Sequence, residues 1–145
     1  MERYIFASHG SLAHGFHSAL EMIAGAGEPV TCYDLSEYQT PGELYAAAEE
    51  QVRVHPGDTF VVFTDLMGGS VHNQLLSLCQ YDNAVVISGA HLGLILEMIL
   101  NKSGGPAIER AQRAVASTTP MIRAFSKETI AAQKEKEDEE GGLFV

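Results

Sequence analysis

The segment Thr59-Phe60-Val61-Val62-Phe63-Thr64, followed at once by Asp65, decides the fold class of this chain. It is rich in β-branched and aromatic residues, which favour strands. Polar residues do not alternate with apolar ones, as they would in a strand with one solvated face. Such a run is typical of a central strand of a parallel sheet, so we expect helices to cover both faces of that sheet.

Other parts of the chain repeat this strand pattern and alternate with helical segments. Tyr4-Ile5-Phe6-Ala7 is one expected strand, and residues 29–33 and 84–88 are two more. Four strands that alternate with helices predict an α/β fold, a flavodoxin-like three-layer sandwich with a parallel sheet of order 2-1-3-4. The expected helices cover residues 12–23, residues 41–52, a segment after Ser70, a segment up to Leu100 and a segment that Pro106 opens at its N1 position.

Local signals support two of these helices. Thr40-Pro41-Gly42-Glu43 combines an N-cap residue, an N1 proline and a capping-box acid, so a helix is expected to begin there. In the helix after Ser70, we expect Leu75, Leu76 and Cys79 on the inner side.

The length of 145 residues suits one compact domain. We assign residues 1–125 to that domain and residues 126–145 to a charged C-terminal helix or tail. Within the tail, residues 141–145 are a candidate terminal strand that would add an antiparallel strand to the sheet.

Charge and composition exclude several classes of protein. The chain has 19 acidic and 9 basic residues and a net charge of −10, which argues against binding to nucleic acid or to anionic lipid. No stretch reaches the roughly 20 apolar residues of a membrane span, and the N-terminus lacks the features of a signal peptide. Cys32 and Cys79 show no zinc-binding spacing. We expect a cytoplasmic protein.

The predicted topology brings two distant residues together. In open parallel sheets, ligands bind beyond the carboxyl ends of the strands, where the strand order reverses. For the order 2-1-3-4, that point lies between the strands that end at Ser8-His9-Gly10 and at Thr64-Asp65. Asp65 would accept a hydrogen bond from one ring nitrogen of His9 and leave the other nitrogen free to attack.

A glycine-rich turn completes this candidate site. Gly68-Gly69-Ser70 precedes a helix, so its free N–H groups and the helix dipole are suited to an anion. Ser70 adds a hydroxyl, either as the N-cap or as a donor to a phosphoryl oxygen, and Gly10 keeps the backbone beside His9 open. The residues therefore predict a site that accepts a phosphoryl group on His9.

The remaining histidines have less distinctive positions. His72, Asn73 and His91 are candidate rim residues of the crevice, whereas His14 and His17 are expected on the surface of the first helix. The histidines show no HxxxH or ExxH pair, so the sequence predicts no metal site and no cofactor.

Three segments resemble the signatures of one family, the IIA components of the mannose-family sugar phosphotransferase system. The first is Phe6-Ala7-Ser8-His9-Gly10, followed by Ala13 and Gly15. The second is the segment from Phe63 to Ser70, followed by Asn73, and the third is Val86-Ile87-Ser88-Gly89-Ala90. The resemblance covers roughly residues 3–115.

This resemblance implies a phosphotransferase that works through a phosphohistidine. The histidine-containing phosphocarrier protein would pass its phosphoryl group to Nε2 of His9, with Asp65 orienting the ring, and a IIB component would take it on toward the IIC and IID membrane components. The resemblance also implies a homodimer, in which a last strand is often exchanged, and no bound metal. The acidic charge would complement a basic docking face on the phosphocarrier protein.

Three alternatives stay open at this point. A small sirohydrochlorin-type metal chelatase would use His9 with His72 or His91, but this leaves the segment Asp65–Ser70 unexplained. The phosphocarrier subunit of dihydroxyacetone kinase shares the strand-end histidine but lacks the Gly-Gly-Ser-x-x-Asn pattern. A regulatory module that senses phosphorylation would be phosphorylated on the same His9.

Overall fold

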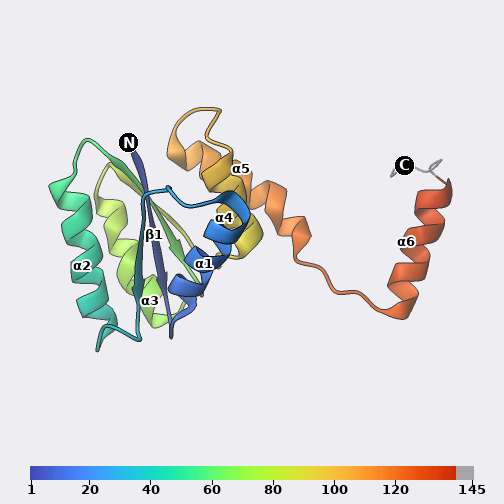
Figure 1. The fold of residues 1–145 in the computed structure, drawn as a ribbon, viewed down its shortest axis with the longest axis horizontal. Coiled ribbons are helices and arrows are strands. Elements are labelled where there is room, and N and C mark those ends of the chain that lie inside the picture. Colours follow the sequence, from blue (N-terminus) through green and yellow to red (C-terminus); the bar gives the residue numbers. More distant parts are fainter. Residues whose placement is uncertain (140–145) are drawn as a thin grey trace.

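A sheet of four parallel strands forms the centre of the molecule in the computed structural model, which describes residues 1–139 (Figure 1). The strand order is β2-β1-β3-β4, which confirms the predicted order. Ala7 of β1 pairs with Thr64 of β3, and Ser8 pairs with Asp34 of β2, so three strands end level at one edge of the sheet. The strands are β1 (Glu2–Ser8), β2 (Val30–Asp34), β3 (Thr59–Thr64) and β4 (Ala84–Ile87).

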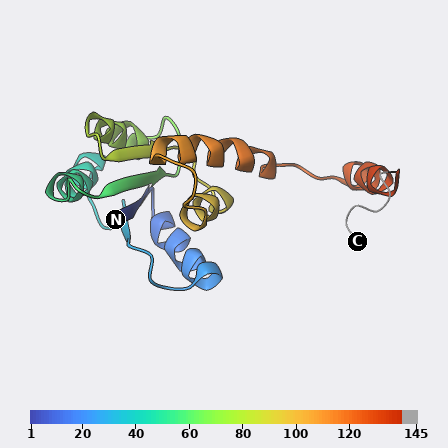
Figure 2. The same ribbon diagram turned by 90° about the horizontal axis from the view of Figure 1, so that it is seen from above.

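Helices cover both faces of the sheet and give the predicted three-layer sandwich (Figure 2). One face carries α1 (Leu12–Ala24), α4 (Leu92–Leu100) and α5 (Ala107–Thr118). The other face carries α2 (Pro41–Val54), α3 (Ser70–Leu75) and the 3₁₀ helix η1 (Leu76–Gln80).

The side chains of β3 explain its uninterrupted apolar sequence. Val61 and Phe63 belong to the core under α1, α4 and α5, whereas Phe60 and Val62 belong to the core under α2 and α3. Because successive side chains of a strand point to opposite faces, a strand with two covered faces has no position for a solvated residue.

The helix starts follow the sequence signals with one correction. The hydroxyl of Thr40 accepts the backbone N–H of Glu43 at 3.1 Å and caps α2 as predicted. Pro106, expected at N1, is instead the N-cap of α5. Its ψ of 151° is extended, so the helical conformation begins at Ala107.

The chain beyond α5 leaves the sheet domain. After the 3₁₀ helix η2 (Thr119–Met121), a segment without regular structure leads to α6 (Lys127–Glu139), which stands apart from the sheet in both views (Figures 1 and 2). None of the residues of α6 is buried. The candidate antiparallel strand at residues 141–145 lies outside the described residues, and within residues 1–139 β4 pairs only with β3.

Among residues 1–139, no helix combines the length and the apolar character that crossing a membrane requires.

Candidate active site

His9 and Asp65 meet at the carboxyl edge of the sheet, as the sequence predicts. Each follows the end of its strand, β1 or β3, and these strands are neighbours. Oδ2 of Asp65 accepts the backbone N–H of His9 at 3.0 Å and lies 3.2 Å from Nδ1 of its ring. The Asp65 side chain is 9% exposed and that of His9 is 40% exposed. A buried carboxylate thus fixes both the backbone and the ring of a histidine that remains open to solvent.

The hydrogen bonds determine which ring nitrogen can react. An ionised carboxylate only accepts, so Nδ1 of His9 carries a proton and donates it to Asp65. In the neutral ring, the lone pair therefore lies on Nε2. The only side-chain partner of Nε2 within residues 1–139 is the hydroxyl of Ser70, with Oγ at 3.3 Å. The nitrogen with the free lone pair is thus the one that faces away from the carboxylate.

The Ser70 hydroxyl is available to bond with Nε2 of His9 because it does not cap a helix. The N-cap of α3 is Gly69, and Ser70 is the first helical residue. Of the two roles that the sequence left open for its hydroxyl, the structure excludes the N-cap. The hydroxyl can donate to Nε2, or to another acceptor that binds beside Nε2.

The two glycines of the turn have different geometry. Gly68 has φ +81°, a left-handed conformation that glycine adopts easily. The N–H of Gly69 already donates to the carbonyl of Leu66 at 3.0 Å, so it is not free for an anion. A Cβ at Gly69 would lie 3.0 Å from Cε1 of His9. Gly69 therefore contributes the space that the His9 ring occupies.

Asn73, predicted at the rim, braces this turn. Its side-chain N–H donates to the carbonyl of Gly68 at 3.3 Å, and its backbone N–H donates to the carbonyl of Gly69 at 2.9 Å. Both bonds fix the loop between Asp65 and Ser70, so Asn73 supports the position of the Ser70 hydroxyl.

The loop that carries His9 is held from the other side by the end of β2. The carbonyl of Ser8 accepts the N–H of Leu35 at 3.1 Å, and that of Gly10 accepts the N–H of Ser36 at 3.3 Å. The hydroxyl of Ser8 accepts the N–H of Ala13 at 2.6 Å and so ties the start of α1 to β1. These bonds leave little freedom to the backbone beside the His9 ring.

The prediction that His72 lies at the rim is wrong. His72 is only 6% exposed, and its Nδ1 lies 3.0 Å from the hydroxyl of Thr64. The buried residues after the turn are Val71, Leu75 and Leu78, whereas Leu76 and Cys79, expected inside, are exposed. Leu75 is buried as expected, and His72 lies three positions before it on the same face, which places His72 inside.

His91, a candidate rim residue, stabilises the start of a helix. It is the N-cap of α4, and its Nδ1 accepts the N–H of Leu94 at 3.4 Å. The chelatase alternative needs a second histidine beside His9. Since His72 is paired with Thr64 and His91 caps a helix, the structure offers no support for that alternative.

Comparisons with known proteins point to one family. A family model described as "PTS system fructose IIA component" matches residues 3–116. A sugar phosphotransferase system permease from Klebsiella pneumoniae is 24% identical, with a TM-score of 0.76, and the match covers 85% of this chain and 90% of that one. For component EIIA from Streptococcus agalactiae, the identity is 24%, the TM-score 0.73 and the coverage 86% and 97%.

A third solved structure has the same fold at lower identity. The mannose/sorbose-specific IIA subunit from Enterococcus faecalis is 18% identical, with a TM-score of 0.71, and the match covers 86% of this chain and 95% of that one. Because all three identities are below 25%, these structures establish the fold alone. The search of curated proteins gives no match.

Proposed function

This chain belongs to the fructose IIA family of the phosphotransferase system (PTS), a family of phosphocarriers, and from that membership we propose that His9 carries the phosphoryl group. The observation that supports this assignment most strongly is the contrast between the two nitrogens of its ring. Nδ1 faces the buried Asp65 carboxylate, whereas Nε2 faces the Ser70 hydroxyl on an exposed ring. One nitrogen is thus held and protonated, and the other is available as a nucleophile.

The proposed reaction is an in-line transfer between two nitrogen atoms. The lone pair of Nε2 forms a bond to the phosphorus atom while the bond between phosphorus and the donor's histidine breaks, and its electron pair returns to the donor ring. The phosphorylated ring of His9 keeps the proton on Nδ1 and becomes cationic, so the Asp65 carboxylate stabilises it. Catalysis consists of positioning and charge stabilisation, without a metal ion bound at His9.

The groups around Nε2 would hold the phosphoryl oxygens. On phosphorylation, the Ser70 hydroxyl turns from Nε2 to a phosphoryl oxygen, which is the stronger acceptor because it is charged. Gly10 and Gly68, with φ of +52° and +81°, shape the backbone on the two sides of the ring. Gly69 leaves room for the ring and the group that it carries.

Family membership also indicates the partners. We propose that the histidine-containing phosphocarrier protein donates the phosphoryl group in the cytoplasm and that a IIB component accepts it, on its way to a sugar that enters through IIC and IID. We further propose that the chain acts as a homodimer. The net charge of −10 would favour encounter with a basic face of the donor, so transfer should slow as the salt concentration rises.

A mass measurement tests the assignment of His9. The protein is incubated with phosphoenolpyruvate, enzyme I and the phosphocarrier protein, and its intact mass is then recorded. We expect the mass of one phosphoryl group, which is lost in acid and is absent from His9→Ala. The matched control is His17→Ala, which removes a histidine of α1 whose side chain is 32% exposed, and the added mass should persist. An unchanged mass of the wild-type protein would contradict the proposal.

A further inference from the structure

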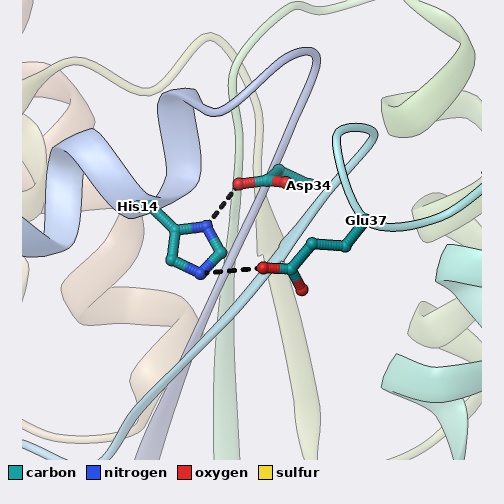
Figure 3. Close-up of side chains that lie close together, drawn as sticks. All are labelled: His14, Asp34 and Glu37. Atoms are coloured by element: carbon teal, nitrogen blue, oxygen red, sulfur yellow. Dashed lines mark hydrogen bonds and ion pairs between the residues drawn. The ribbon is translucent and has the colours of Figure 1, made fainter.

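A second histidine lies between two carboxylates close to the His9 loop (Figure 3). His14 comes from α1, Asp34 is the last residue of β2, and Glu37 lies in the turn that follows. Nδ1 of His14 pairs with Oδ2 of Asp34, and its Nε2 lies 3.3 Å from Oε1 of Glu37. One possible ligand atom from each side chain lies within 4.8 Å of those from the other two.

The charges of this cluster are unbalanced when His14 is neutral. The Asp34 side chain is fully buried, and within residues 1–139 its only ion-pair partner is His14. In the same part of the chain, Glu37 also pairs only with His14. A buried carboxylate is costly without a compensating charge. The cluster therefore favours a cation, which is either a proton on His14 or a metal ion.

We propose that His14, Asp34 and Glu37 form a binding site for a divalent transition-metal ion of the Zn²⁺ class. An imidazole nitrogen and two carboxylate oxygens are ordinary ligands of zinc, and three protein ligands leave one position open. Asp34 faces Nδ1 of His14 and Glu37 lies beside Nε2, so one ion can take only one ring nitrogen. At Nδ1 the ion would replace the proton between that nitrogen and Oδ2 of Asp34, and the exposed Glu37 side chain would turn toward it. This site is separate from the function proposed for His9 and does not depend on it.

Hydrogen bonds hold the carboxylates near these positions. The Ser36 hydroxyl donates to Oδ1 of Asp34 and leaves Oδ2 for His14 or an ion. The N–H of Glu37 donates to the Asp34 carbonyl at 3.1 Å, which closes the turn. The side chains of His14 and Glu37 are 48% and 53% exposed, so they are free to adjust. The buried ligand is thus fixed, and the two ligands at the surface are adaptable.

A backbone hydrogen bond connects this site to the loop that carries His9. Ser36, which orients Asp34, also donates its backbone N–H to the carbonyl of Gly10 at 3.3 Å. A bound ion would therefore fasten the turn after β2 to the start of α1, on one side of the His9 loop.

A titration of the metal-free protein with Co²⁺ tests the proposal, because cobalt replaces zinc and has visible absorption bands. The buffer is kept at about pH 8, since the hydrogen bond with Asp34 raises the pKa of His14 and a proton competes with the ion. We expect one saturable equivalent of Co²⁺ that added Zn²⁺ displaces. Zn²⁺ should also raise the melting temperature of the protein.

Four variants assign the ligands. His14→Gln and Glu37→Gln should each weaken binding at least about tenfold, and Ser36→Ala, which frees the Asp34 carboxylate, should weaken it about tenfold. The matched control is His17→Gln, because His17 lies on the same helix and its Nε2 is 3.0 Å from a single carboxylate, that of Glu21. This control should bind Co²⁺ like the wild-type protein.

Two results would overturn the proposal. If the wild-type protein binds no Co²⁺ or Zn²⁺, then the cation of the cluster is a proton. If binding survives in both His14→Gln and Glu37→Gln but is lost in His9→Gln, the ion belongs to the His9 site. The mass measurement of phosphorylation is independent of these titrations, so failure of one proposal is distinguishable from failure of the other.

Discussion

His9 and His14 are held alike at Nδ1 and differently at Nε2. In each case Nδ1 meets an aspartate at the carboxyl edge of the sheet, Asp65 just after β3 or Asp34 at the end of β2. Nε2 of His9 then meets the Ser70 hydroxyl, whereas Nε2 of His14 meets the Glu37 carboxylate. A hydroxyl can donate to a lone pair, but a carboxylate only accepts. The partner of Nε2 thus separates a nucleophile from a ring whose two carboxylates favour a cation, either a proton on the ring or a bound metal ion.

We expect the largest difference in the rate of phosphoryl transfer when each of the two histidines is replaced in turn by glutamine. His9→Gln removes the nucleophilic nitrogen and should abolish phosphoryl transfer, whereas His14→Gln should transfer at close to the wild-type rate. The rate is measured by rapid quenching with the phosphorylated phosphocarrier protein as donor. Loss of transfer in His14→Gln, with its fold retained in a circular dichroism spectrum, would break the comparison.

The two aspartates should differ nearly as strongly. Asp65→Asn removes the carboxylate that fixes the protonated nitrogen, and we expect transfer to slow about 10²- to 10⁴-fold. Asp34→Asn should leave the rate unchanged but lower the free energy of unfolding by about 1–3 kcal/mol, because buried hydrogen bonds are lost.

Quenched-flow kinetics and urea denaturation measure these two effects separately. The comparison predicts a kinetic defect for one variant and a defect in stability for the other. Equal kinetic defects would mean that both aspartates serve the His9 site.

Replacing the partners of Nε2, Ser70 for His9 and Glu37 for His14, should give a smaller difference in the rate of transfer. Ser70→Ala removes one donor to the phosphoryl oxygens and should slow transfer about 10- to 100-fold. Ser70→Thr, which keeps the hydroxyl, should recover most of the rate, and Glu37→Gln should transfer normally. If Ser70→Ala is as fast as the wild-type protein, the hydroxyl does not contact the transferred group.

His72 provides the smallest expected effect on transfer. His72→Leu removes the buried partner of the Thr64 hydroxyl and should lower the free energy of unfolding by about 1 kcal/mol. Because His72 is buried away from solvent, phosphoryl transfer and Co²⁺ binding should both remain close to those of the wild-type protein. Loss of metal binding in this variant would instead support a chelatase-like use of His72.

The sequence was most informative where a single physical rule decides the structure. The apolar run from Thr59 to Thr64 predicted a strand covered on both faces, and strand order then placed His9 opposite Asp65. Burial on both sides requires such a run, and the ends of parallel strands meet at one edge. These two rules needed no knowledge of side-chain packing.

Features that depend on tertiary contacts could not be predicted in the same way. α3 is a single short helix that continues as the 3₁₀ helix η1, so a regular helical period wrongly placed Leu76 and Cys79 inside, where η1 buries Leu78 instead. The residues His14, Asp34 and Glu37 do not follow the fixed spacing of a metal-binding motif, because they come from a helix, a strand end and a turn. Because the sequence contains no HxxxH or ExxH pair, it predicts no metal site.

Gly68 and Gly69 are adjacent, yet they should tolerate different replacements. Gly68 needs a left-handed backbone, but no atom lies within 4 Å of a Cβ built there, so asparagine and aspartate should be accepted. Gly69 has an ordinary φ of −72°, but its Cβ would lie 3.0 Å from Cε1 of His9 and 3.1 Å from the Leu66 carbonyl oxygen. In a library of all substitutions, position 68 should select for backbone conformation, and position 69 should select for the absence of a side chain.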